Sequence, residues 1–413
     1  MVQAILGFFI AIFTARFLGP ENYGIVTYAS SLTSFVLPIV QLGFTSVLVY
    51  EFVNNPHDEG KILGTTILLS VISAFISILG IFTFCMITNA GEKDTIIVCV
   101  LYSISLVFQA TELIIYWFQA KYLSKYTAIA MFIAYVAMSL YRVFLLITGK
   151  SIYWFSVAQS FDYVIVSILL FVVYKKKDGQ KLSFSLSIAK RLLRRSKYYI
   201  LSGIMVTVFA QTGRIILKLM LGNAETGFYS VAVNCAGLLG FVFPAIIDAF
   251  RPSVLEKKKI SQQEYEKAVI NLYAVVFQLA LIFSLVLFVF AELVIEVLYG
   301  DDYNGAVSIL RVIVWYSAFS YFGGAKDVWI LAEEKQKYLI VLNAAGAVVN
   351  LSLNFLLIPI WGGVGAALAS LVTQIFANII MCIIIKPLRR NAYLFLQSLN
   401  PKILINLIKS NLK

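Results

Sequence analysis

Apolar runs long enough to cross a lipid bilayer follow one another along the whole chain, separated by short polar segments. None of these runs alternates like a transmembrane β-strand. We therefore expect an all-α polytopic membrane protein of about 12 transmembrane helices. The expected spans are Val2–Leu18, Thr27–Tyr50, Ile62–Thr88, Thr95–Phe118, Thr127–Thr148, Ile152–Tyr174, Tyr198–Leu221, Phe228–Phe250, Ala268–Tyr299, Ala306–Leu331, Tyr338–Ile360 and Gly363–Ile385.

Lysine and arginine are concentrated in alternate loops, after the fourth, sixth, eighth, tenth and twelfth expected spans. Because cytoplasmic loops carry the excess of positive charge, we expect both termini to be cytoplasmic. The longest basic segment separates two sets of six spans, and part of it, Lys190–Lys197, is expected to form an amphipathic helix at the leaflet surface. The predicted organisation is an N-terminal six-helix bundle at 1–174, a basic cytoplasmic linker at 175–197, a C-terminal six-helix bundle at 198–388 and a cytoplasmic interfacial tail at 389–413.

A short motif indicates that the two halves are related. Leu18-Gly19-Pro20-Glu21-Asn22-Tyr23-Gly24 follows a cationic apolar run, and Leu221-Gly222-Asn223-Ala224-Glu225-Thr226-Gly227 follows another about half a chain later. Internal similarity at corresponding points is typical of a duplicated architecture. Two halves of six spans enter the membrane in the same direction, which predicts parallel repeats with a substrate path between them.

The composition excludes several classes of protein. The chain has 413 residues, of which 61% are hydrophobic and only 13% charged, whereas soluble domains are about a quarter charged. The net charge of +12 then reflects the positive-inside rule rather than nucleic-acid binding. Four cysteines are scattered through apolar runs, and the only histidine, His57, lies in a polar loop. We therefore expect no metal site and no cofactor.

Charged residues inside the apolar runs are the candidate functional groups, because burying a charge in a bilayer costs about 2.5–3.5 kcal/mol on insertion scales. Arg214 and Lys218 are four residues apart and share a helix face. Arg16 lies at a similar height in the first half, and Arg142 lies deep in the fifth span. Such cations could line a cavity for a phosphate-bearing ligand. The alternatives are snorkelling to the headgroups for Arg16 and an ion pair with Asp162 for Arg142.

Polar amides recur at helical spacing in the eleventh span, where Asn350 and Asn354 are one turn apart. Amides combined with aromatic residues are typical of sugar-binding sites, and 15% of the chain is aromatic. Hydrogen bonding between helices would explain the same asparagines equally well.

Ala15-Arg16-Phe17-Leu18-Gly19-Pro20-Glu21-Asn22-Tyr23-Gly24 resembles the first-helix signature of bacterial polysaccharide transporters. These are the Wzx-type flippases for O-antigen and capsule repeat units, in the MATE-like (MOP) superfamily. Four later stretches fit the same family in order and spacing: Leu42-Gly43-Phe44-Thr45, Gly227-Phe228-Tyr229-Ser230, Leu298-Tyr299-Gly300-Asp301-Asp302-Tyr303, and Asn350 to Gly365-Ala366-Ala367.

The resemblance implies a bacterial plasma-membrane protein that moves undecaprenyl-pyrophosphate-linked oligosaccharide from the cytoplasmic to the outer leaflet. The residues expected to contact this substrate are Arg16, Arg142, Arg214, Lys218, Asn350 and Asn354. Beyond substrate and bilayer, a polysaccharide polymerase, chain-length machinery and a proton or sodium gradient are further candidate partners. Nucleic acid is not expected, nor is enzymatic activity.

Two features depart from the family pattern. Family members often carry an acidic residue near the middle of the seventh span, where this chain has Gly213 beside Arg214. The first span has only about 17 residues, fewer than the roughly 20 of a full crossing, as in a chain that begins part-way into a helix. A MATE-type ion-coupled multidrug exporter is the alternative function, although the first span lacks the carboxylate which that chemistry favours.

Overall fold

The computed structural model describes residues 2–411, with side chains over residues 6–407. Throughout the described range the regular elements are helices. Nine of the described helices are long and apolar enough to cross a membrane. The expected all-α membrane fold is therefore confirmed.

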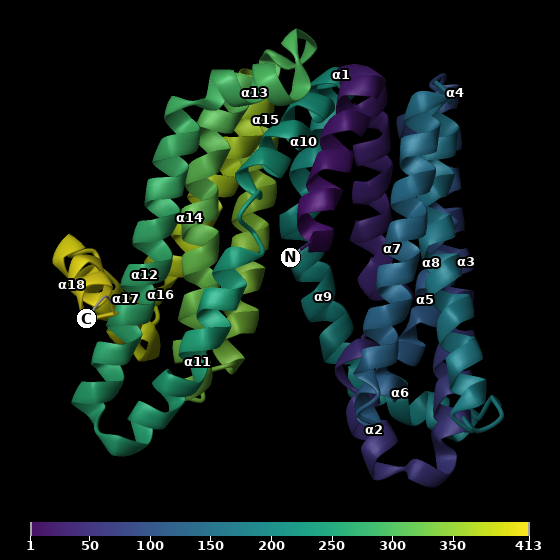
Figure 1. Cartoon of the computed structure of the whole chain (residues 1–413), viewed down its shortest axis with the longest axis horizontal. Helices are drawn as coiled ribbons and strands as arrows, with labels where there is room; N and C mark the ends of the chain where they lie inside the picture. The colour runs from purple at the N-terminus through teal and green to yellow at the C-terminus, as the bar shows by residue number, and fades with distance from the viewer. Residues whose placement is uncertain (1, 412–413) are drawn as a thin grey trace. The chain divides into compact units, whose positions relative to one another are not determined.

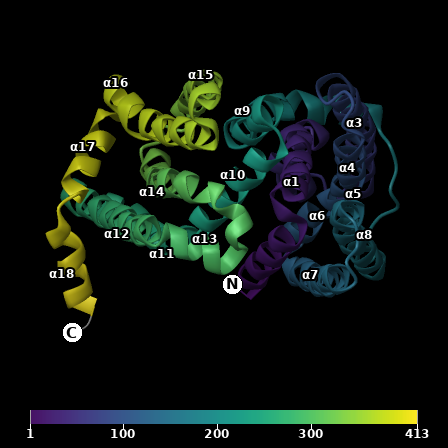
Figure 2. The same cartoon turned by 90° about the horizontal axis from the view of Figure 1, so that it is seen from above.

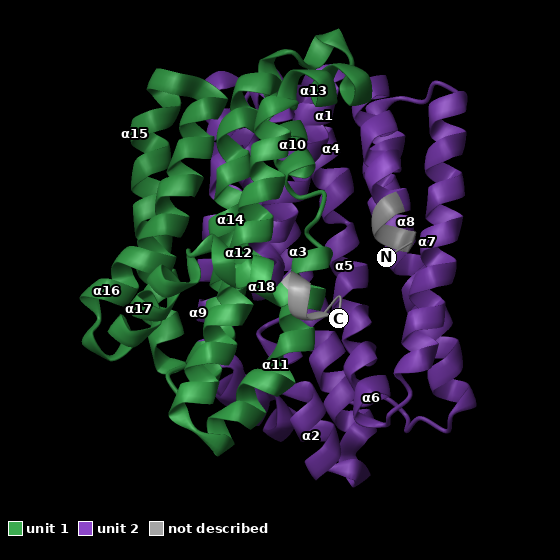
Figure 3. Cartoon of the chain, turned by 60° about the vertical axis from the view of Figure 1, so that its left-hand side comes forward, with its two compact units in different colours: residues 1, 228–413 green, residues 2–227 purple. Residues whose placement is uncertain are grey.

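The contacts within the chain divide it into two compact units, residues 2–227 and residues 228–413 (Figure 3). The first unit contains helices that run side by side (Figure 1). They are α1 (Val2–Val40), α3 (Glu59–Thr88), α4 (Lys93–Ser103), α5 (Ser105–Thr111), α7 (Ser124–Ile147), α8 (Ile152–Lys176) and α9 (Leu186–Leu221), joined by the short α2 (Leu48–Asn54) and α6 (Ile115–Ala120).

The second unit is built on α12 (Gln262–Val289), which packs against both α11 (Val242–Ile260) and α14 (Gly305–Ala332). Figure 2 shows the C-terminal helices lying along the edge of this unit beside α12. Its remaining helices are α13 (Ala291–Tyr299), α15 (Lys337–Ile375), α16 (Met381–Ile384), α17 (Arg389–Ser398) and α18 (Pro401–Asn411). Helices α17 and α18 make the tail helical from Arg389 to Asn411, apart from the short break at residues 399–400.

Two helices turn back at a glycine and each supplies two of the expected spans. Gly19 in α1 has φ 70° and ψ 169°, and Gly362 in α15 has φ 56° and ψ −134°. Residues with a side chain rarely adopt these angles, which are essentially confined to glycine. Glycine therefore determines where these spans end.

The expected span Phe228–Phe250 is not continuous. It is divided between α10 (Asn223–Ala236) and α11, with turns over residues 237–241. Gly237 and Gly240 lie in this interruption, and glycine is the weakest helix former after proline. The expected span Thr27–Tyr50 likewise ends early, because α1 stops at Val40.

The basic segment Lys190–Lys197 is helical, and its place at the leaflet surface stays a prediction. Lys190–Lys197 forms the first turns of α9, which continues without a break to Leu221. Before α9, the extended chain crosses α3, where the Ser183 amide donates to the Gly60 carbonyl at 3.3 Å. A Cβ on Gly60 would lie only 2.3 Å from the Lys181 carbonyl oxygen, so glycine permits this crossing.

Helix α9 packs within the first unit, mainly against α1. The boundary between the compact units thus falls at Gly227, later in the chain than the basic segment 175–197. The prediction that the basic segment separates two duplicated six-helix bundles concerns internal repeats rather than compact units. It stays a prediction.

The two matched glycine motifs meet in the structure. A Cβ on Gly24 would lie 1.9 Å from the carbonyl oxygen of Asn223, and a Cβ on Gly227 would lie 2.3 Å from that of Pro20. Each motif therefore needs its last glycine to accommodate the backbone of the other. This reciprocal contact supports the internal similarity seen in the sequence.

Candidate functional site

One face of the first arm of α1 is exposed in the part of the chain whose side chains are described. Leu6, Phe9, Phe13, Arg16 and Phe17 are all exposed, and their spacing of three or four residues places them on one side of the helix. Within the described residues, Arg16 has neither an ion pair nor a hydrogen bond. Arg16 is thus an uncompensated guanidinium on an aromatic helix face.

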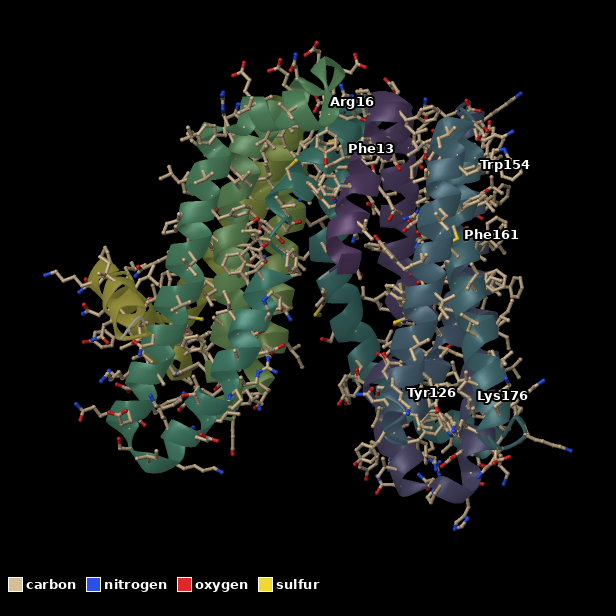
Figure 4. The ribbon with its side chains drawn as sticks, viewed as in Figure 1. Phe13, Arg16, Tyr126, Trp154, Phe161 and Lys176 are labelled. Carbon is tan, nitrogen blue, oxygen red and sulfur yellow. The ribbon has the colours of Figure 1, made fainter. Side chains whose placement is uncertain are left out.

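Figure 4 places Arg16 toward the end of the first unit that lies opposite Lys176 and Tyr126. Lys176 belongs to the basic loops, so Arg16 lies toward the end expected to face outward. It precedes the Gly19 turn by three residues, or about 4.5 Å along the helix axis.

The two cations of α9 have different environments. Arg214 is half-buried and its Nη1 lies 3.5 Å from Oε1 of Gln211. Lys218 is buried, and its Nζ lies 2.5 Å from Oε2 of Glu92 in the turn between α3 and α4. Lys218 can reach a ligand only if it leaves this carboxylate.

Burial disfavours the charged form of Glu92, but hydrogen bonds from Lys218 and Thr95 outweigh this cost. The pKa of Glu92 is therefore held below its ordinary value. The ion pair fixes the C-terminal end of α9 against the α3–α4 turn. Sequence inspection identified Lys218 but missed Glu92, because the two residues are 126 positions apart.

Arg142 in α7 is half-buried and its Nη2 lies 3.5 Å from Oε1 of Gln159 in α8. Gln159, rather than Asp162, receives this hydrogen bond. Arg142 comes five residues before the end of α7 at Ile147, and Lys218 comes four before the glycine that ends α9. The structure thus brings Arg16, Arg142 and Lys218 to the same end of the first unit.

Asn350 and Asn354 lie in the second unit and their side chains are buried in helix contacts. Asn354 Nδ2 donates to Oδ1 of Asn350 at 2.9 Å, and Asn350 Nδ2 donates to Oγ1 of Thr373 at 3.4 Å. Both residues are at most 1% exposed. In this structure neither amide is open to a ligand, and the alternative of hydrogen bonding between helices describes them better.

A cleft that sequence inspection missed lies in the first unit, between the end of α1 and the first half of α9. Its volume is about 350 Å³, at the low end for small-molecule sites. Its residues come from segments more than 150 positions apart, so no local signal marks it. It is lined by Leu37, Pro38, Gln41, Gly43, Thr45, Ser46, Tyr199, Ser202, Gly203, Val206 and Thr207.

Comparison with solved structures identifies the fold. The chain is similar to a multidrug-resistance MATE-family transporter of the MOP superfamily in an inward-facing conformation, with a TM-score of 0.73, 14% identity, and 94% and 96% of the two chains covered. It is equally similar to the lipid II flippase MurJ in an inward closed conformation, with a TM-score of 0.73, 14% identity, and 99% and 91% coverage. The fold is that of a MATE-like membrane transporter.

The sequence narrows this class to one family. The chain belongs to the family of polysaccharide biosynthesis proteins, whose sequence model matches residues 1–256. A putative O-antigen transporter of Shigella flexneri is 24% identical over 384 residues, which cover 86% of this chain and 88% of the relative. The expected resemblance to polysaccharide transporters is thereby confirmed.

Proposed function

We propose that this protein is a flippase that moves polyprenyl-diphosphate-linked oligosaccharide repeat units across the plasma membrane for surface polysaccharide synthesis. Family membership and the relative named as a putative O-antigen transporter support this function over drug export. The observation that carries the proposal is Arg16, an exposed guanidinium on the aromatic face of α1 that has no partner among the described residues.

The physical task is to bring a charged diphosphate and a polar glycan through a medium that solvates neither. A guanidinium offers a diphosphate paired, charge-assisted hydrogen bonds, which offset the loss of hydration. Arg16 supplies this contact directly, and Arg214 and Arg142 supply further positive charge from neighbouring helices. Arg214 lies 3.5 Å from the side-chain amide of Gln211, and Arg142 lies 3.5 Å from that of Gln159.

Lys218 can contact the diphosphate only after it leaves Glu92. Its ammonium is held by Glu92, so the diphosphate must compete with a carboxylate for it. A ligand that binds two conformations equally well does not change the equilibrium between them. Exchange of Lys218 between Glu92 and the substrate would provide the required difference in affinity between the two conformations.

The test is a flipping assay in proteoliposomes with labelled undecaprenyl-diphosphate-linked repeat unit from cells that express the protein natively. We expect Arg16→Gln to slow the appearance of glycan on the opposite leaflet about tenfold or more. The mutation removes the positive charge that stabilises the diphosphate while it crosses the membrane. Lys150→Gln makes the same charge change at an exposed position beyond α7. With this variant the glycan should cross at the wild-type rate.

Proton and sodium gradients are applied separately and together, so that a missing driving force is not mistaken for inactivity. Wild-type crossing no faster than in protein-free liposomes under all gradients would overturn the function. Crossing retained by Arg16→Gln would keep the function and make Arg16 an interfacial anchor.

A further inference from the structure

The cleft between α1 and α9 is an open groove whose two walls pack directly against each other. Its two walls touch where Gly203 packs on Pro38, since a Cβ on Gly203 would lie 2.9 Å from the Cβ of Pro38. They touch again where Gly43, at φ 64°, lies against Ser196, and a Cβ there would lie 2.8 Å from the Ser196 carbonyl oxygen. Two glycines thus hold the walls together beside the opening.

Polar side chains in the cleft are available to a ligand. Those of Gln41, Ser46, Tyr199 and Ser202 make no hydrogen bond to the described part of the chain, and none of them is fully buried. Together they offer an amide, two aliphatic hydroxyls and a phenol, which can both donate and accept. Such groups beside an aromatic ring match the hydroxyls and the apolar face of a sugar.

The mouth of the cleft carries positive charge. Arg195 precedes Tyr199 by one helical turn, about 6 Å along the axis, and its side chain is 45% exposed although it pairs with Glu51. The guanidinium lies over the ring of Tyr50, 5.5 Å from the ring centre. Arg194 and Lys197 are also exposed at the start of α9, on other faces of the helix. A ligand that combines a sugar with a phosphate group would satisfy both the cleft and its rim.

We propose that the α1–α9 cleft is a loading site that binds the sugar nearest the diphosphate of the lipid-linked glycan at the expected cytoplasmic end. The diphosphate then faces the arginine-rich rim at the start of α9, and the volume admits a sugar residue rather than a whole repeat unit. This inference rests on the proposed function. The proposed loading site lies at the basic end of the first unit, and Arg16 lies toward the opposite end.

Equilibrium binding of the radiolabelled repeat-unit lipid to the purified full-length protein in detergent tests this site. We expect Tyr199→Ala to raise Kd about tenfold, which corresponds to about 1.4 kcal/mol. Gln41→Ala, a smaller change, should raise it several-fold. Tyr198→Ala is the matched control, because this neighbouring tyrosine is exposed and outside the cleft. Its Kd should equal that of the wild type.

Binding of sugar-free undecaprenyl diphosphate shows whether the cleft recognises the sugar or is a general lipid groove. All three variants should bind it like the wild type, because the arginine rim is intact. Equal loss of sugar-bearing and sugar-free lipid would show a phosphate or phospholipid groove and overturn the proposal.

The flipping assay distinguishes failure of this inference from failure of the proposed function. In that assay Tyr199→Ala should raise the half-saturating substrate concentration and keep the maximal rate. If the wild type flips the glycan and both cleft variants bind and load normally, only the loading site is wrong. If the wild type does not flip it, the proposed function fails as well.

Discussion

At the scale of single residues, the Glu92–Lys218 pair shows how a buried lysine is tolerated. The Lys218 side chain is 1% exposed, while that of Glu92 is 44% exposed. Replacing Glu92 with glutamine would leave a buried ammonium without a counter-charge. We expect a loss of about 2 kcal/mol in unfolding free energy, below the full cost of breaking a buried pair because solvent screens Glu92. Thermal unfolding in detergent at pH 7 measures it.

The pH dependence of this loss has a definite sign. The folded-state pKa of Glu92 lies below its ordinary value, so the pair stabilises the protein above the ordinary glutamate pKa of about 4.3. The contribution is lost as pH falls through the lowered value. The difference between wild type and Glu92→Gln should therefore shrink in acid. Lys218→Met should abolish the effect of Glu92→Gln, and additive losses in the double mutant would contradict the pairing.

At the scale of helices, we expect alanine substitution to have opposite effects on stability at two helical glycines, Gly24 and Gly80. Gly24→Ala places a Cβ 1.9 Å from the Asn223 carbonyl, and the backbone must move apart. We expect a loss of about 1–3 kcal/mol, typical of overpacking. At Gly80 in α3 a Cβ meets nothing within 4 Å. Gly80→Ala should be neutral or stabilising by up to about 1 kcal/mol, because alanine favours the helix.

Melting temperatures of these two variants, purified in the same detergent, make the comparison. A wild-type melting temperature for Gly24→Ala would mean that α1 and the Asn223 turn do not approach each other as the structure shows. The sequence identified both motifs but did not show that they touch.

At the scale of the whole molecule, the expected orientation can be tested by cysteine labelling. Cys85, Cys99, Cys235 and Cys382 are all buried, so the wild type gives a low background. Asp302 and Gln336 are exposed just beyond opposite ends of α14. We expect Asp302→Cys to react with an impermeant maleimide in intact spheroplasts. Gln336→Cys should react only after permeabilisation, because it adjoins a basic loop. The reverse pattern would invert the topology.

The sequence by itself determined the membrane class, most of the spans and the family. A bilayer admits only helices or closed barrels, and long apolar runs without alternation satisfy their backbone groups as helices, so length and pattern suffice for the fold class. The first expected span ends at Leu18, and the structure interrupts α1 at the next residue, Gly19, because backbone geometry at such a site depends on the residue itself.

Only the tertiary structure decided which polar residues are free and which are paired. It buried Asn350 and Asn354, joined Lys218 to Glu92, left Arg16 without a partner among the described residues, and formed the cleft beside Tyr199. It also made Lys190–Lys197 part of α9 and broke the eighth expected span at Gly237 and Gly240. Each outcome depends on packing between segments far apart in the chain, and hydrophobic periodicity carries no information about such partners.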